Sequence, residues 1–216
     1  KFDYFNEIPF KIIQKKSLLS IECEGLWRKA KDESNFNIVR KKLSELVDLI
    51  KLESDILSQK WNKSKYDCLL SIYDRSFKTE ELKFFFSDIE IFLKTNLEKI
   101  KKSQSKLEKI RFQNLLNEDE QFELSRYLMQ KIGFNFKKGR IDKSLHPFCG
   151  GSTDDIRITT RFTKNDTFSC FDALMHETGH ALYEFGLPKK WSHQPLGKAG
   201  GMSLHESQSL FVEMQL

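Results

Sequence analysis

The sequence contains no apolar run long enough to cross a membrane and no recognisable secretory signal at its first residues. A membrane-spanning helix needs roughly 20 apolar residues, and no stretch of these 216 residues approaches that length. The four cysteines are scattered without the Cys-x-x-Cys spacing of metal or redox sites. A soluble cytoplasmic protein with free thiols is therefore expected.

No nucleic-acid-binding motif is present either, although the formal net charge is +5. The 36 Lys and Arg residues are interspersed with 31 Asp and Glu residues. This pattern is typical of solvated helix faces rather than of a phosphate-binding surface. The sequence therefore predicts neither a nucleic-acid nor a membrane partner.

Histidine is absent from the first 145 residues, so no conventional metal site is expected there. From about residue 10 to 130, apolar residues recur at three- and four-residue spacing in a Lys- and Glu-rich background. This pattern predicts a helical scaffold region over residues 1–140, followed by a metal-site region over residues 141–216. The 19 phenylalanines, including the run at 84–86, are expected to fill the core.

The second region contains His176-Glu177-Thr178-Gly179-His180, which matches the HExxH signature of zinc hydrolases. On an α-helix, positions i and i+4 share a face, so both imidazoles can bind one ion. The carboxylate beside the first histidine then lies next to the open side of the ion. The motif predicts two metal ligands and a general base, Glu177.

A helix is predicted around this motif, because apolar residues flank it at helical spacing. Ser169 and Asp172 are candidate start residues, and Gly186 followed by Pro188 is a stop signal. The motif would then lie in the middle of the helix.

A catalytic zinc site needs a third protein ligand, and the helix itself does not supply one. Glu184 is eight residues after His176, about 12 Å further along the helix axis, so one ion cannot reach both. The metzincin pattern is excluded, because this chain has Tyr183 and Gly186 where that pattern requires Gly and His. The third ligand must come from another segment.

Three residues downstream are candidates for this ligand: His193, His205 and Glu206. Residues 202–214 have the pattern of a second amphipathic helix, with Leu210, Phe211 and Met214 as its apolar side. A glutamate from a second helix would complete a two-histidine, one-glutamate site. The spacing favours Glu206 over His193.

Ahead of the motif, apolar and polar residues alternate over residues 155–162, which predicts a strand with one apolar face. Two interpretations of Asp155 and Arg157 remain open. The strand could pair with an extended substrate backbone, or the two side chains could tie it to neighbouring helices through an ion pair. His146 could border the substrate pocket or be a turn residue before proline, and Gly150-Gly151 indicate a flexible loop.

Several of these segments resemble the M32 metallocarboxypeptidases, and they occur in that family's order. They are His146-Pro147-Phe148, Asp155-Ile156-Arg157-Ile158-Thr159, His176 to His180, and His205-Glu206-Ser207. They are similar to the family's HPF, DxRxT, HExxH and HES motifs. The linking stretches are similar as well, so the resemblance covers essentially the whole chain.

The resemblance implies a mainly α, gluzincin-like zinc-peptidase fold with a small β element beside the HExxH helix. It implies zinc on His176, His180 and Glu206, with Glu177 as general base, and a set of ligands that also accepts cobalt. It further implies removal of single residues from peptide C-termini, a homodimer, and substrate contacts at His146 and Arg157. A zinc oligopeptidase or endopeptidase, or an inactive remnant that acts only as a helical binding protein, remains as an alternative.

Both ends of the sequence look cut, since Lys1 is not a natural start and Leu216 falls inside the second predicted helix. Members of the family are roughly twice as long and carry IRxxAD and GxxQDxHW motifs that this sequence lacks. Those segments are expected to grip the substrate's C-terminal carboxylate and to stabilise the oxyanion. The chain is therefore expected to hold the metal half of an active site.

Overall fold

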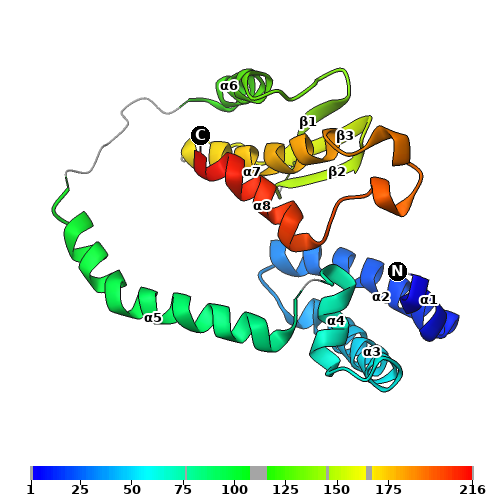
Figure 1. Cartoon of the computed structure of the whole chain (residues 1–216). Helices are drawn as coiled ribbons and strands as arrows, with labels where there is room; N and C mark the ends of the chain where they lie inside the picture. Colours follow the sequence, from blue (N-terminus) through cyan, green and yellow to red (C-terminus); the bar gives the residue numbers. More distant parts are fainter. Residues whose placement is uncertain (1, 76, 108–115, 145, 164–166, 216) are drawn as a thin grey trace. The chain divides into compact units, whose positions relative to one another are not determined.

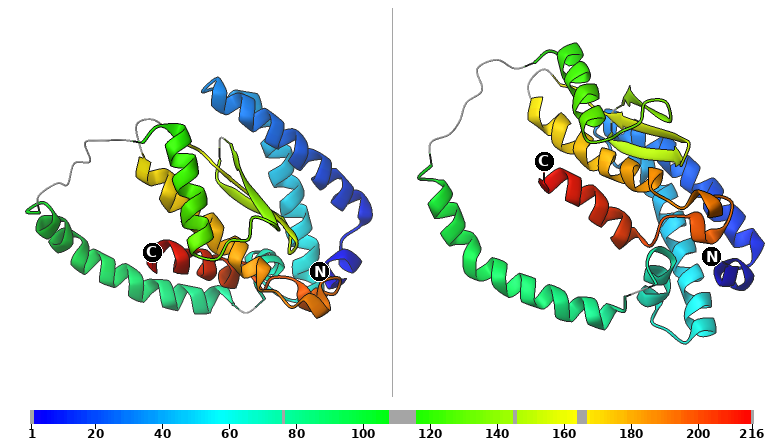
Figure 2. Two further views of the ribbon diagram at one scale, coloured as in Figure 1. Left: turned by 90° about the horizontal axis from the view of Figure 1, so that it is seen from above. Right: turned by 45° about the horizontal axis from the view of Figure 1, so that its top comes forward.

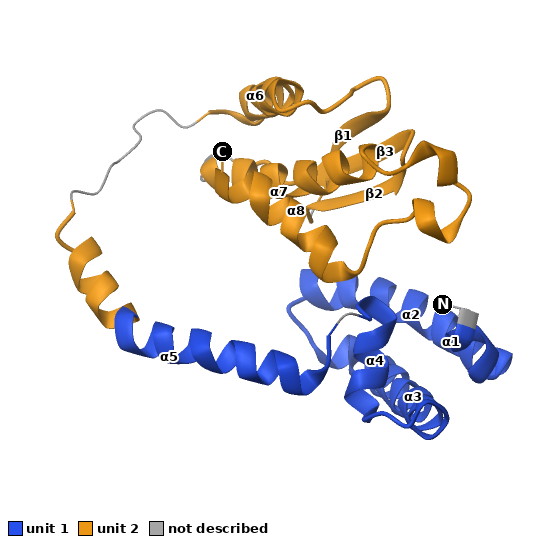
Figure 3. Ribbon diagram, viewed as in Figure 1, with its two compact units in different colours: residues 1–96 blue, residues 97–216 orange. Residues whose placement is uncertain are grey.

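The computed structural model describes residues 2–75, 77–107, 116–144, 146–163 and 167–215. The chain divides into two compact units, Lys1–Asn96 and Leu97–Leu216 (Figure 3). The division expected from the sequence, at residue 140, stays a prediction. None of the helices in the described segments is long and apolar enough to cross a membrane.

The first unit is helical, as the periodicity of its sequence predicts. Its helices are α1 (Phe2–Glu7), α2 (Phe10–Asp32), α3 (Asn37–Trp61), α4 (Lys65–Tyr73) and most of α5 (Thr79–Gln104). Tyr4, Ile8, Leu57 and Cys68 form a buried cluster that joins α1, α3 and α4. Beside it, Lys16 on α2 donates from Nζ to Glu53 on α3 at 2.6 Å.

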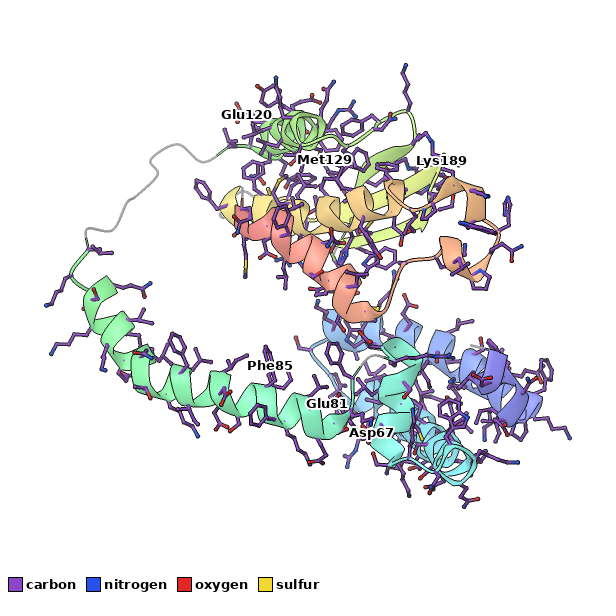
Figure 4. All side chains as sticks on the ribbon, in the orientation of Figure 1. Asp67, Glu81, Phe85, Glu120, Met129 and Lys189 are labelled. Carbon is purple, nitrogen blue, oxygen red and sulfur yellow. The ribbon has the colours of Figure 1, made fainter. Side chains whose placement is uncertain are left out.

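Helix α5 differs from the others, because none of its residues, all of which the structure describes, is buried. Phe84, Phe85 and Phe86 are 75%, 60% and 58% exposed. Phe85 is labelled in Figure 4 and projects away from the helix. The expectation that this run of phenylalanines fills the core is therefore wrong, because none of the three side chains is buried.

The second unit contains a three-stranded sheet with the order β1-β3-β2. Strand β1 (Gly139–Lys143) pairs parallel with β3 (Asp155–Thr160), and β2 (Phe148–Ser152) pairs antiparallel with β3 on its other side. Ile156, Ile158 and Thr160 are buried on one face of β3, and Arg157 is exposed on the other. This confirms the alternation predicted for the segment.

The glycine pair predicted to form a flexible loop lies in strand β2 instead. Gly151 has φ +121°, and a Cβ there would lie 2.1 Å from the carbonyl oxygen of Asp155 on β3. Because glycine has no Cβ, the two strands can approach this closely and still turn back on each other. Here glycine permits strand pairing rather than an open loop.

Helix α6 (Glu118–Lys131) and helix α7 (Thr167–Phe185) complete the core of this unit. Figure 4 labels Met129 on the side of α6 that faces α7, and Met129 packs with Leu174 of α7 and with Ile156 and Ile158 of β3. Helix α7 ends at Phe185, as predicted from Gly186. It begins at Thr167, ahead of both candidate start residues, Ser169 and Asp172.

The last helix, α8 (Met202–Gln215), confirms the second helix predicted from the sequence. Two short 3₁₀ turns, η1 (Lys189–Trp191) and η2 (Pro195–Gly197), lead the chain to it. Figures 1 and 2 show α8 running back alongside α7. Its predicted apolar residues Leu210, Phe211 and Met214 are exposed, and the buried residue is Ser209.

Candidate metal centre

The HExxH segment occupies the middle of α7, where burial on one side fixes the direction of its polar side chains. Leu174 and Ala181 are fully buried, and Thr178 donates from Oγ1 to the carbonyl oxygen of Leu174 at 2.7 Å. Positions 176 and 180 lie one turn apart on the side that meets α8. The rings of His176 and His180 are 4.9 Å apart, nearly perpendicular.

Helix α8 brings Glu206 against both histidines. Its Oε1 lies 3.3 Å from His176 Nε2, and its Oε2 lies 3.4 Å from His180 Nε2. The candidate ligand atoms of the three residues all lie within 4.8 Å of one another. This is the group predicted from the sequence.

The chemistry of these donors fits a divalent transition-metal ion. Two imidazole nitrogens and one carboxylate oxygen form the ligand set of a catalytic zinc site, which leaves a fourth position for water or substrate. In the described part of the chain no other group of three such residues has this spacing. The two imidazole nitrogens and the carboxylate oxygens are therefore close enough to share one divalent cation.

Glu177 is half-buried next to this group. Burial is the main cause that raises the pKa of its carboxyl above the ordinary value. The nearby carboxylate of Glu206 raises this pKa further, while His176 and His205 act in the opposite direction. A raised pKa makes a carboxylate a stronger base.

The pKa of His180 is lowered, chiefly because the ring is partly buried and also because His205 and His176 lie beside it. A lowered pKa favours the neutral imidazole, which is the form that binds a metal. Its Nδ1 is buried without a hydrogen-bond partner among the described residues. The ring packs against that of His205 at 4.4 Å between centroids.

The other candidate ligands lie outside the group of three. His205 Nε2 lies 3.0 Å from Oε1 of Glu184, so these two residues pair with each other. This agrees with the exclusion of Glu184 as a ligand by its distance along the helix. His193 is exposed in the turn between η1 and η2.

A small cavity of about 60 Å³ adjoins the site, and residues of strand β2 line part of it. Its lining includes Cys149, Gly150, Glu184 and His205. Burial raises the pKa of the Cys149 thiol to about 12, with contributions from Glu177 and Glu184, so the thiol stays protonated. Sequence reasoning treated Cys149 only as one of four scattered cysteines, because its position beside the metal helix depends on how the sheet packs.

The proposed substrate contacts, His146 and Arg157, are both exposed. His146 lies before β2, and its carbonyl oxygen accepts from Thr159 Oγ1 at 2.8 Å. Arg157 donates from Nη2 to Asp155 Oδ2 at 2.9 Å within β3, so this ion pair does not tie the strand to a helix. The expectation that a substrate backbone pairs with β3 is also wrong, because β1 and β2 occupy both edges of this strand.

One residue of the site was missed by sequence reasoning. Glu213, on α8, places its Oε2 2.8 Å from Nδ1 of His176. Its spacing of seven residues from Glu206 was the available signal, since positions i and i+7 share a helix face.

Comparison with known proteins agrees with this geometry. The profile of the carboxypeptidase Taq (M32) metallopeptidase family matches residues 1–216. Carboxypeptidase 1 of Bacillus subtilis is 28% identical over 214 residues, which cover 99% of this chain and 42% of that protein. Thermostable carboxypeptidase 1 of Pyrococcus furiosus is 32% identical over 214 residues, which cover 95% of this chain and 41% of that protein.

A solved structure shows the same fold. Metallocarboxypeptidase 1 of Trypanosoma cruzi superposes with a TM-score of 0.83 at 31% identity, over 96% of this chain and 42% of that one. The chain thus spans about two fifths of the length of the relatives it matches. The family profile matches all 216 residues, the helical fold is shared, and the His, His and Glu side chains converge. This chain therefore belongs to the carboxypeptidase Taq (M32) family of metallopeptidases.

Proposed function

We propose that His176, His180 and Glu206 bind zinc, and that the chain contributes this site to a metallocarboxypeptidase. The reaction is hydrolysis of the C-terminal peptide bond of peptides. The observation that carries the proposal is the convergence of the three ligand atoms within 4.8 Å of one another, beside the half-buried carboxyl of Glu177. Relatives named as carboxypeptidases support the substrate class.

Each residue has a distinct task in this reaction. When bound, a divalent ion supplies Lewis-acid polarisation of the scissile carbonyl and lowers the pKa of water. Glu177 accepts the proton of the attacking water and delivers it to the leaving amine. His176 and His180 hold their Nε2 atoms toward Glu206, where the metal would lie.

Zinc is the proposed metal because two nitrogens and one oxygen are its usual donors at catalytic sites. The same ligand set accepts cobalt, so the metal in the cell is decided by supply as well as by affinity. The roles of His146 and Arg157 in substrate binding stay predictions. The homodimer, the cytoplasmic location and the absence of nucleic-acid partners, expected from the sequence, also stay predictions.

Two matched substrates test the reaction. The zinc-loaded chain is assayed with a dipeptide that is blocked at its N-terminus and carries a free C-terminal carboxylate, and with its C-terminal amide. A carboxypeptidase cleaves the acid and ignores the amide. Equal cleavage of both would instead support an oligopeptidase or endopeptidase, and zinc binding without cleavage of either would contradict peptidase activity of this chain.

A further inference from the structure

Helix α8 meets the imidazole of His176 at both of its nitrogens. Nε2 faces Glu206 at 3.3 Å, while Nδ1 lies 2.8 Å from Oε2 of Glu213. The two glutamates are seven residues apart, which is about two helical turns, so both side chains extend from the same face of α8. The ring of His176 is thus held between two carboxylates of one helix.

The shorter of the two contacts, at Nδ1, favours a proton on that nitrogen. The 2.8 Å separation is a hydrogen-bond distance, so a proton on Nδ1 would be donated to the carboxylate of Glu213 and the lone pair would remain on Nε2. Nε2 is the atom directed at Glu206, where the metal ligands converge. The side chains of His176 and Glu213 are 23% and 33% exposed, so the contact is partly shielded from water.

The other histidine ligand has no such partner among the described residues. The Nδ1 of His180 is buried without a hydrogen bond, and its ring packs against the ring of His205. His205 pairs with Glu184, not with Glu213. Among the described residues, a carboxylate therefore faces Nδ1 of His176 but not Nδ1 of His180.

We propose that Glu213 is a positioning residue, which holds His176 as the Nδ1–H tautomer with Nε2 directed at the metal. Carboxylate partners of this kind orient a histidine ligand and raise its basicity, and their loss typically weakens metal binding 10- to 100-fold. Helix α8 then supplies one ligand directly and orients a second. The inference rests on the proposed metal site, although not on peptidase activity.

Metal affinity tests this role directly. The zinc dissociation constant of the 216-residue chain is measured by competition with a chromophoric chelator, for the unaltered chain, Glu213→Ala, Glu213→Gln and Gln215→Ala. We expect Glu213→Ala to weaken binding by about 10- to 100-fold. Glu213→Gln should lose less, because its amide oxygen still accepts from Nδ1. Gln215→Ala, exposed on the same helix, is the matched control and should bind zinc as the unaltered chain does.

A second readout separates positioning from general loss of structure. Two-bond ¹H–¹⁵N spectra of the metal-free unaltered chain should show His176 protonated at Nδ1, and thermal melts of the metal-free variants should match the melt of the metal-free unaltered chain. If Glu213→Ala fails to fold, the zinc affinity of Glu213→Gln and the spectrum of the unaltered chain still test whether Glu213 positions His176. Protonation at Nε2 in that spectrum would overturn the proposal.

The outcomes also distinguish this inference from the proposed function. A Glu213→Ala chain that folds and binds zinc with unchanged affinity overturns the positioning role alone. Zinc binding by the unaltered chain without peptide hydrolysis contradicts peptidase activity of this chain alone and leaves the role of Glu213 intact. An unaltered chain that binds no zinc contradicts both.

Discussion

At the residue scale, two neighbouring carboxylates of the site have different tasks. Glu206 lies within 3.4 Å of both histidine Nε2 atoms and belongs to the metal group. Glu177 is on the same helix as the histidines, is not one of the three grouped ligands, and has a pKa raised chiefly by burial. Substitutions at these two positions should therefore affect different measurements.

We predict that Glu177→Gln abolishes turnover but retains zinc. The amide cannot accept a proton from water, and loss of a general base typically lowers kcat by about 10²- to 10⁴-fold. Zinc content by elemental analysis should stay at the level of the unaltered chain, because none of the three ligands is changed. Glu123→Gln, at an exposed position of α6, is the control for losing a carboxylate. Full activity of Glu177→Gln would contradict the role of this residue.

The same residues show what a sequence can reveal about a site. His176 and His180 are predictable because four-residue spacing on a helix fixes their relation, whatever surrounds them. Glu206 follows from the need for a third ligand and from a recognisable second helix. Glu213 is not predictable in this way, because its contact with His176 joins residues 37 positions apart and depends on how the two helices pack.

At the scale of elements, the site depends on how closely α7 and α8 approach each other. The approach occurs at Gly179, inside the HExxH segment. A Cβ at Gly179 would lie 2.6 Å from the Cα of Ser209 and 2.7 Å from the carbonyl oxygen of Gln208. Both atoms belong to the backbone of α8, so a side chain here would have to move the helix that carries Glu206.

We predict that Gly179→Ala weakens both folding and zinc binding. Alanine favours a helix over glycine by about 1 kcal/mol, but overpacking of a tight contact costs about 1–3 kcal/mol. Displacement of α8 should also weaken zinc binding by about tenfold, since it carries a ligand. Urea unfolding and chelator competition measure the two effects.

The matched control is Gly25→Ala on α2, where nothing lies within 4 Å of the added methyl group. This variant should gain up to about 1 kcal/mol of stability from the helix propensity of alanine. If Gly179→Ala gained stability in the same way, the close approach of α7 and α8 would not limit that position.

A second junction of elements gives a prediction about pH. Asp67 on α4 accepts from the backbone N–H of Thr79 at 2.8 Å and from its hydroxyl, at the start of α5, and it accepts from Ser64 Oγ at 2.7 Å. The side-chain bond from Thr79 is the main cause that lowers the pKa of Asp67 from 3.8 to about 2. The folded state thus favours the ionised form of this carboxyl.

The sign of the effect on stability follows from this lowered pKa. The stabilisation from Asp67 is fully present above about pH 4 and is lost as the pH falls through about 2. Carboxyl ¹³C titration of Asp67 and unfolding in urea at several acidic pH values measure the two quantities. Asp67→Asn should lose this part of the pH dependence, and a carboxyl of Asp67 that titrates near its ordinary value would contradict the prediction.

The elements themselves were predictable to different degrees. Helix α7 has long apolar periodicity and a glycine-proline stop, and its predicted end is confirmed. Strand β2 contains the pair Gly150-Gly151, which has no side-chain pattern, so its pairing with β3 is visible only in the structure. In helix α5 the sequence pattern misleads. Its apolar periodicity predicts a buried face, but none of its residues is buried.

At the scale of the whole molecule, the three proposed metal ligands belong to one of the two units. The second unit contains His176, His180, Glu206 and a core formed by α6, α7 and the sheet. The first unit has its own buried cluster around Leu57 and Cys68. A ligand that binds only the folded second unit should therefore stabilise that unit alone.

We predict that zinc increases hydrogen-exchange protection in residues 116–215 and leaves residues 2–96 unchanged. At a free zinc concentration of 100 times the dissociation constant, linkage adds about 2.7 kcal/mol to the opening free energy of structure coupled to the site. Helix α6 is the most informative segment, because it belongs to the second unit in the structure but to the scaffold region expected from the sequence. Protection of α6 by zinc would support a boundary near residue 96, and its absence would support one near residue 140. Glu206→Ala is the control, since zinc should protect neither unit in this variant. If zinc protected residues 2–96 of the unaltered chain as strongly as residues 116–215, the independence of the two units would be contradicted.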